Sequence, residues 1–135
     1  MDLEEIITSK SAKVEVNLED LSIKCYPELI GLIFYNLINN RLKFNESKVP
    51  KVVCTYDENK THWLFFVQDN GIGIDSEYTE KIFQPFNRLQ GSNYEGSGIG
   101  LSICKRVVNI HKGKIWVEQN DLEGACFKIS ISKKL

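Results

Sequence analysis

Asp69-Asn70-Gly71-Ile72-Gly73-Ile74 is the stretch that decides the fold, and a second glycine-rich stretch, Gly96-Ser97-Gly98-Ile99-Gly100-Leu101, follows it along the chain. Glycines clustered in this way let a backbone approach a ligand closely, where a side chain would block it. The second stretch opens a strongly helical segment, and the free amides at a helix N-terminus form a site for anions. Asp69 comes directly before the first cluster, where its carboxylate could accept a hydrogen bond from a ring amine. We therefore expect a binding site for a nucleoside triphosphate.

A polar stripe lies upstream, in the segment Asn36-Leu37-Ile38-Asn39-Asn40-Arg41-Leu42-Lys43-Phe44. Asn36, Asn40 and Lys43 are four and three residues apart, so a helix would place them on one face. In an arbitrary helix such a stripe is more often a solvated surface. Beside the two glycine clusters it favours a metal and phosphate site, because Mg²⁺ prefers hard oxygen ligands and takes most of its charge balance from the nucleotide phosphates.

A fourth element, Ile82-Phe83-Gln84-Pro85-Phe86-Asn87-Arg88, lies between the glycine clusters. In this order the four elements resemble the ATP-binding domain of sensor histidine kinases, which shares a superfamily with DNA gyrase, the mismatch-repair ATPases and a heat-shock chaperone. The resemblance runs from about Pro27 to Phe127, and the sequence matches neither the P-loop pattern nor the dinucleotide fingerprint. It implies the Bergerat ATP-binding fold. That fold is an α/β (α+β) two-layer sandwich, in which three helices cover a mixed, mostly antiparallel sheet of about five strands.

The resemblance also implies a role for each matching residue. Asn40 would ligate Mg²⁺, Asn36 would orient water or the metal's other ligands, and Lys43 would contact a phosphate. Asp69 would accept a hydrogen bond from the adenine amino group, which selects against guanine because guanine presents a carbonyl oxygen at that position. The remaining nucleotide-binding positions belong to the first glycine cluster, to a lid that closes over ATP, to the second cluster and to a closing strand. They are Gly71, Gly73, Ile74, Phe83, Phe86, Arg88, Gly96, Gly98, Ile99, Gly100, Leu101 and Cys126.

Two residues depart from the family pattern. Arg41 stands where the family usually carries alanine, and it extends the apolar stripe of Ile33 and Leu37. We expect its charged head to reach water at the helix end; the alternative is that it crowds the site and weakens nucleotide binding. Cys126 stands where a threonine hydroxyl normally supports the adenine-binding aspartate. A thiol is a weaker donor, so lower adenine affinity is expected.

Hydrophobic periodicity predicts the elements around these motifs. Helices are expected at 27–43, 76–82 and 98–111, with Gly113 as the C-cap of the last. Strands are expected at 12–17, 21–25, 51–56, 63–68, 114–118 and 126–132, the first two as a hairpin. Residues 84–97 show little periodicity and are expected to form a mobile lid. His111 lies on the apolar stripe of the last helix, where a packed histidine is more common than a catalytic one.

Composition is that of an ordinary globular domain. The chain has 135 residues, of which 42% are hydrophobic, and a formal net charge of −1. We expect one domain over residues 1–135 that does not bind nucleic acid. No apolar run approaches the roughly 20 residues of a membrane span, and no signal peptide is evident, so a cytoplasmic domain without direct membrane contact is expected. The four cysteines are widely spaced, and we expect them to be buried and reduced.

The function that the resemblance implies is that of an ATP-dependent protein-histidine kinase in a two-component system. Such a domain transfers the γ-phosphate of Mg-ATP to a histidine on a dimerisation domain, which then passes it to a response regulator. The residues after His62 and His111 do not fit a phosphoacceptor motif, so we expect a catalytic fragment of a longer sensor kinase, with the dimerisation domain absent. Two alternatives keep the fold: a serine kinase or gyrase-class ATPase, and a degenerate nucleotide-binding docking module. Asn36 stands where the ATPases carry a catalytic glutamate, which leaves no evident general base for water.

Overall fold

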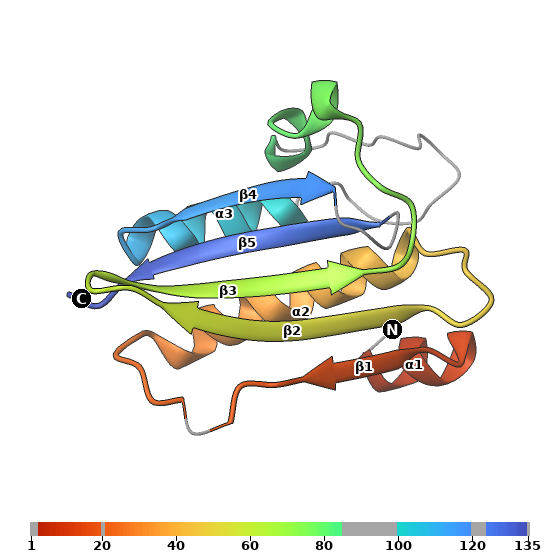
Figure 1. Ribbon diagram of the computed structural model, residues 1–135, viewed down its shortest axis with the longest axis horizontal. Coiled ribbons are helices and arrows are strands. Elements are labelled where there is room, and N and C mark those ends of the chain that lie inside the picture. The colour runs from red at the N-terminus through yellow and green to blue at the C-terminus, as the bar shows by residue number, and fades with distance from the viewer. Residues whose placement is uncertain (1–2, 20, 85–99, 120–123, 135) are drawn as a thin grey trace.

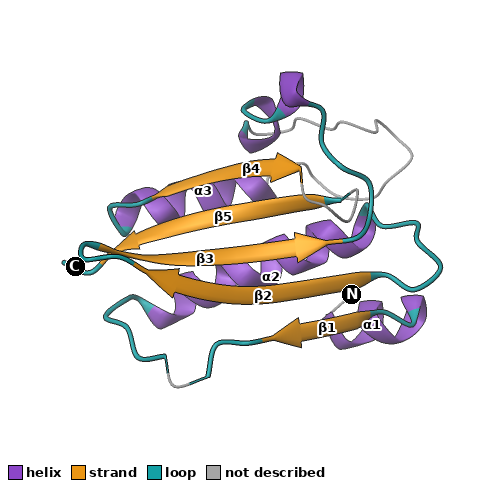
Figure 2. Cartoon of the chain, viewed as in Figure 1, coloured by secondary structure: helices purple, strands orange, loops and turns teal. Residues whose placement is uncertain are grey.

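The computed structural model describes residues 3–19, 21–84, 100–119 and 124–134. Its elements are α1 (Leu3–Lys10), β1 (Lys13–Val16), α2 (Pro27–Lys43), β2 (Lys51–Glu58), β3 (His62–Asp69), the 3-10 turns η1 (Ser76–Tyr78) and η2 (Lys81–Phe83), α3 (Gly100–Ile110), β4 (Lys114–Gln119) and β5 (Ala125–Ser132). The strands form one sheet in the order β1-β2-β3-β5-β4. β1 runs parallel to β2, and the other neighbours are antiparallel. α2 and α3 lie on one face of the sheet (Figures 1 and 2), which confirms the predicted two-layer sandwich.

The hydrophobic core fills the space between the sheet and these two helices. Side chains alternate between the two faces of a strand, and on the three central strands the set that faces the helices is buried. Phe65 and Phe127, at 1% and 0% exposed, are the largest side chains in this layer. Other core residues are Val52 and Cys54 on β2, Val67 on β3, Ile129 and Ile131 on β5, Ile33, Leu37 and Leu42 on α2, and Cys104, Val107 and Val108 on α3.

A buried histidine joins the start of α2 to the end of α3. α2 begins as predicted, with Pro27 in its first turn, where the missing N–H leaves no bond unmade. The amide of Tyr26, just before it, donates to Nε2 of His111 at 3.1 Å. Nδ1 of His111 lies 2.9 Å from the carbonyl oxygen of Val107, so the ring carries its proton on Nδ1 and donates it there. His111 is fully buried, which confirms that it is a packed residue at the helix end.

The turn between α3 and β4 corrects the predicted C-cap. Lys112, with a φ of 55°, adopts the left-handed conformation that the sequence predicts for Gly113. Gly113 is required for a different reason, because a Cβ there would lie 1.7 Å from the carbonyl oxygen of Ser130. After α3, therefore, a lysine occupies the position with positive φ, and the glycine occupies the position where a side chain would collide with β5.

The N-terminal segment also differs from the prediction. α1 is an additional helix, and residues 21–25 form no strand; instead of a hairpin, β1 pairs with β2 at the edge of the sheet. Lys10, the last residue of α1, donates through Nζ to the backbone carbonyls of Leu42 and of Asn45, the latter at 3.2 Å. These carbonyls lie at the end of α2, where a helix leaves its last carbonyl groups without partners. Hydrogen bonds from Lys10 thus hold α1 against the end of α2.

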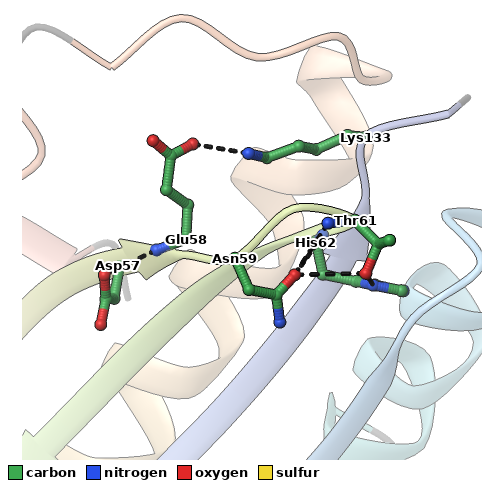
Figure 3. Close-up of polar contacts among 6 residues, drawn as sticks. All are labelled: Asp57, Glu58, Asn59, Thr61, His62 and Lys133. Atoms are coloured by element: carbon green, nitrogen blue, oxygen red, sulfur yellow. Dashed lines mark hydrogen bonds and ion pairs between the residues drawn. The ribbon is translucent and has the colours of Figure 1, made fainter.

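A hydrogen-bonded turn joins β2 to β3 at one end of the sheet. Oδ1 of Asn59 accepts hydrogen bonds from the amides of Thr61 at 2.9 Å and His62 at 2.8 Å (Figure 3). Lys133, which follows β5, pairs with Glu58 at 2.7 Å. His62 is the first residue of β3, and its amide helps to close this turn.

The predicted helix over 76–82 is two separate 3-10 turns, η1 and η2. Phe83, at the end of η2, is 6% exposed and packs edge-to-face against Phe127, with ring centroids 6.0 Å apart. This aromatic contact holds the segment against the core. None of the helices in the described residues is long and apolar enough to cross a membrane.

Candidate nucleotide-binding site

The polar face of α2 lies against the start of α3. Nδ2 of Asn36 donates to the carbonyl of Leu32 at 2.9 Å, one turn back along the helix. Its Oδ1 faces α3, since a Cβ added to Gly100 would lie 2.9 Å from that oxygen. Asn40 and Lys43 continue the same face, and both are partly exposed. The structure thus brings Asn36 against the first residue of α3, with Asn40 and Lys43 further along the same face of α2.

Asp69 ends β3 as a buried carboxylate, 2% exposed. Its Oδ1 accepts a hydrogen bond from the amide of Gly71 at 2.9 Å, and the amide of Ala125 also donates to it. Burial raises the pKa of the Asp69 carboxyl, and the Arg41 guanidinium and the two amides oppose that shift. Figure 1 shows the end of β3 and the end of α2 at the same end of the molecule. The residue expected to recognise adenine therefore lies near the residues expected to bind the metal and phosphates.

Arg41 does not reach water, so the expectation that its head escapes at the helix end is wrong. The residue is 3% exposed, and Nη1 lies 3.5 Å from Oδ2 of Asp69. Nε donates to Oδ1 of Asn40 at 3.1 Å, and the guanidinium lies over the ring of Phe127, 5.2 Å from its centroid. Burial lowers the pKa of Arg41, and Asp69 opposes this. A planar guanidinium can stack and donate at once, and here it connects the carboxylate expected to recognise the base with the asparagine expected to bind the metal.

A network of hydrogen bonds around Asn70 joins the first glycine cluster to the segment that follows α2. Oδ1 of Asn70 accepts from Nδ2 of Asn45 at 2.8 Å and from the amide of Lys51 at 2.9 Å. Ser47 donates through Oγ to the Asn70 carbonyl at 2.8 Å. Gly71 fits against Asn45 because it lacks a side chain; a Cβ there would lie 2.9 Å from Cγ of Asn45. The turn that carries Asp69 is thereby held at a fixed place relative to α2.

Three of the predicted nucleotide-binding positions are packing residues. Ile74 and Phe83 are 5% and 6% exposed and belong to the core, and Leu101 packs against the core from the first turn of α3. Gly73, between the turn and Ile74, is partly exposed. These residues border the site by holding its segments against the sheet. Phe86, Arg88, Gly96, Gly98 and Ile99, together with most of the predicted lid, lie outside the described residues.

The closing strand places the side chain of Cys126 on the opposite face of the sheet from that of Asp69. Gln68 pairs with Cys126 and Val67 with Phe127, so the residue opposite Asp69 is Ala125. Ala125 belongs to the core on the helix side of the sheet, whereas the side chain of Cys126 alternates to the other face. Gly124 adjoins Asp69 more closely still, because a Cβ there would lie 2.1 Å from the Asp69 carbonyl oxygen. Support for the carboxylate therefore comes from this backbone and from Arg41.

A groove of about 660 Å³ lies between residues 74–79 and the end of β4. Asp75, Glu77 and Glu118 line it, and three carboxylates disfavour a triphosphate. The described residues that the sequence predicts to bind the nucleotide lie mainly elsewhere, on α2, in the turn after β3 and at the start of α3. There the amide oxygens of Asn36 and Asn40 are hard donors of the kind that Mg²⁺ prefers.

Four contributors to the site were missed by sequence reasoning. The contribution of Arg41 was signalled weakly by a charge on an apolar stripe, and that of Asn70 by its place in the Asp-Asn-Gly turn. Asn45 and Gly124 gave no signal, because their importance depends on contacts across the fold. The cysteines are free, as expected, although Cys25 is only partly buried.

Known proteins match both the sequence and this arrangement. Residues 25–135 match the family model described as histidine kinase-, DNA gyrase B- and HSP90-like ATPase. The phytochrome-like protein Cph1 of Synechocystis sp. is 37% identical over 141 residues, which cover 96% of this chain and 19% of Cph1. The adaptive-response sensory kinase SasA of Nostoc sp. is 33% identical over 133 residues, which cover 96% of this chain and 33% of SasA. The chain thus spans a fifth to a third of these relatives.

Among solved structures, the nucleotide-free catalytic domain of histidine kinase ThkA matches with a TM-score of 0.79 and 31% identity. That match covers 96% of this chain and 86% of the ThkA domain. ThkA in complex with the response regulator TrrA matches with a TM-score of 0.75 and 26% identity, over 99% of this chain and 41% of that one.

Proposed function

Because the chain belongs to the family of histidine kinase-, DNA gyrase B- and HSP90-like ATPases, we propose that it is the ATP-binding catalytic domain of a sensor histidine kinase. In this role it binds Mg-ATP and transfers the γ-phosphate to a histidine on a separate dimerisation domain. The observation that carries the proposal is the buried Asp69 carboxylate, held by the Gly71 amide beside the asparagine face of α2.

Each part of the nucleotide has a partner in this arrangement. Asp69 accepts a hydrogen bond from the 6-amino group of adenine, and the glycines after it leave room for the base and ribose. Lys43 and the first amides of α3 bind phosphate oxygens. Asn40, with Asn36 beside it, would hold Mg²⁺ through its amide oxygen. When bound, that ion supplies neutralisation of the phosphate charge.

The chain's own residues favour transfer to another group over hydrolysis. The amide of Asn36 cannot take a proton from water, so a general base is missing at that position. The chain's two histidines are also badly placed as acceptors. His62 lies at the far end of β3 from Asp69, about 23 Å away at the usual rise per residue. His111 is fully buried at the end of α3 that lies farthest from Gly100. The acceptor histidine is therefore supplied by another domain.

The partners follow from this assignment. A histidine-containing dimerisation domain of the same kinase supplies the acceptor, and a response regulator receives the phosphoryl group, as supported by the complex of ThkA with TrrA. A near-neutral net charge of −1 supports the absence of nucleic-acid binding. We assign the domain to the cytoplasm, where ATP is available.

One observation favours the alternative of a nucleotide-binding module without transfer. Nε of Arg41 occupies one lone pair of Asn40 Oδ1, the atom expected to ligate Mg²⁺. An amide oxygen has two lone pairs, so Oδ1 of Asn40 can accept the Arg41 hydrogen bond and ligate a metal ion at the same time. If the hydrogen bond instead excluded the metal, the affinity for Mg²⁺ would fall.

Calorimetry with Mg-ADP, followed by transfer from labelled ATP to the dimerisation domain of the full-length kinase, tests the proposal. Asn40→Asp should abolish transfer, whereas Asn109→Asp, the same change at an exposed position of α3, should not. Failure of the unmodified domain to bind adenine nucleotide at about 1 mM would overturn the proposal. Binding without transfer by the intact kinase would support the docking module.

A further inference from the structure

The carboxylate expected to recognise adenine is one half of a buried ion pair. The side chains of Arg41 and Asp69 are 3% and 1% exposed. In the ion pair between Lys51 and Glu15, by contrast, 43% and 53% of the two side chains are exposed. Surface pairs of that kind are screened by water, whereas a buried pair determines the charge state of its members.

We propose that Arg41 is a positioning residue that determines base specificity: its charge keeps Asp69 in the anionic, hydrogen-bond-accepting form that takes a purine 6-amino group. This inference rests on the proposed function, in which Asp69 binds adenine. Arg41 acts through Asp69, because its own guanidinium is held by Asn40 and Phe127 and is almost fully buried.

The chemistry depends on one proton. An ionised carboxylate only accepts hydrogen bonds, whereas a protonated one also donates. Adenine presents a 6-amino donor, and hypoxanthine and guanine present a 6-oxo acceptor. A carboxylate therefore selects adenine, and a carboxylic acid at the same place accommodates a 6-oxo purine by donating its proton to that oxygen.

The surroundings of Asp69 make Arg41 decisive for that proton. Burial alone favours the neutral acid, and it raises the pKa of the Asp69 carboxyl. Among the described residues, the groups that act on the carboxylate are the Arg41 guanidinium and the amides of Gly71 and Ala125, while the Cys126 thiol lies on the other face of the sheet. The thiol is neutral, since burial raises its pKa as well. Of these groups only Arg41 brings a full positive charge, so its removal leaves a carboxyl that takes up a proton from solvent.

The experiment compares ADP with inosine diphosphate, which carries a 6-oxo group in place of the 6-amino group. Calorimetry is run with Mg²⁺ on four proteins: unmodified, Arg41→Met, Arg41→Lys and Arg106→Met. Arg106 is an exposed arginine on α3, so Arg106→Met makes the same change without touching the site. The unmodified domain and Arg106→Met should prefer ADP by about 10- to 100-fold, the factor given by one hydrogen bond to a charged acceptor.

In Arg41→Met most of that preference should disappear near neutral pH and return as the pH is raised and Asp69 ionises. Arg41→Lys keeps a charge and should retain most of the preference. If Arg41→Met does not fold, Arg41→Lys still decides the question. Lysine is a weaker partner for the carboxylate, so Asp69 should take up its proton at a higher pH than in the unmodified domain. As the pH is lowered, Arg41→Lys should therefore lose the ADP preference first.

Three outcomes would overturn the inference. The first is equal weakening of both nucleotides at every pH, which would assign Arg41 a structural role alone. The second is tighter ADP binding with an unchanged preference, which would mean that Arg41 crowds the site. The third is an unshifted pH profile in Arg41→Lys. Failure of the unmodified domain to bind either nucleotide would instead count against the proposed function, so the two failures are distinguishable.

Discussion

Replacement of Arg41 by methionine should lower the free energy of unfolding by about 3–5 kcal/mol, the range observed when one partner of a buried pair is removed. Nη1 of Arg41 lies 3.5 Å from Oδ2 of Asp69. At an effective dielectric constant of about 20, two unit charges at that separation attract by about 5 kcal/mol. Desolvation offsets most of this attraction while both partners are present, but a single substitution leaves the other partner buried without its opposite charge, and the Asp69 carboxyl must then take up a proton at a cost in stability. Asp69→Asn should therefore cost a similar amount, and the double variant should cost much less than the sum of the two single losses.

Urea unfolding measures these differences, with Trp63 and Trp116 as fluorescent reporters. The matched control is the exposed pair Lys51 and Glu15, where Lys51→Met should change stability by less than about 1 kcal/mol. Additive single losses in the Arg41 and Asp69 double-mutant cycle would refute the reasoning, because coupling is what a buried pair requires.

The same variant has a signed pH dependence. In Arg41→Met, burial holds the pKa of the Asp69 carboxyl above its unfolded value. Below that unfolded value, about 4, the group is protonated in both states. As the pH rises through the folded pKa, the folded protein must give up a proton that the unfolded chain has already released, and stability is lost. The difference from the unmodified protein should thus grow from acid to neutral pH; a difference that shrinks would contradict the assignment.

Three further predictions concern other residues. Lys112→Gly should raise the free energy of unfolding by about 1 kcal/mol, because glycine adopts the left-handed conformation without a Cβ penalty; an unchanged urea midpoint would contradict this. Gly113→Ala should lower it by more than about 3 kcal/mol, since the new methyl would lie 1.7 Å from a backbone oxygen of β5, and a stable variant would show that the turn can shift. Burial raises the pKa of Cys54 to about 11 and of Cys104 to about 12. Ellman's reagent at about pH 8 should therefore label Cys25 before Cys54 and Cys104, which should react only in denaturant; rapid labelling of Cys54 or Cys104 in the folded protein would contradict their burial.

Features that depend on local sequence were predicted well. The helix over 27–43 was given by its apolar stripe and by Pro27, and the central strands by alternating apolar residues. α1 was not predicted, because its sequence is rich in β-branched residues and its stability depends on Lys10 binding the end of α2. Residues 21–25 alternate like a strand but find no strand partner, since β1 pairs with β2 instead. Contacts between residues far apart in the sequence therefore determine the structure of both segments.

The candidate site divides in the same way. Helical spacing correctly placed Asn36, Asn40 and Lys43 on one face of α2, because helical period is a local property, whereas most of the second glycine cluster lies outside the described residues. The burial of Arg41 depends on Asp69, 28 positions later in the chain, and no local pattern reports such a pair. The misplacement of Cys126 came from counting positions in a motif, whereas strand alternation assigns the inner place to Ala125.

The hydrogen-bond network around Asn70 affects how readily this asparagine deamidates. Asn70 and Gly71 form an Asn-Gly step, in which the glycine nitrogen can attack the asparagine side chain and convert it to an acid through a cyclic imide. In the folded protein the Gly71 amide is bound to Oδ1 of Asp69 at 2.9 Å, and Oδ1 of Asn70 is held by Asn45 and Lys51. The reactive partners are therefore kept apart while the fold persists. Deamidation at this step should therefore increase with the time that the chain spends unfolded, and each event would place a new negative charge in the turn that is proposed to receive the nucleotide base.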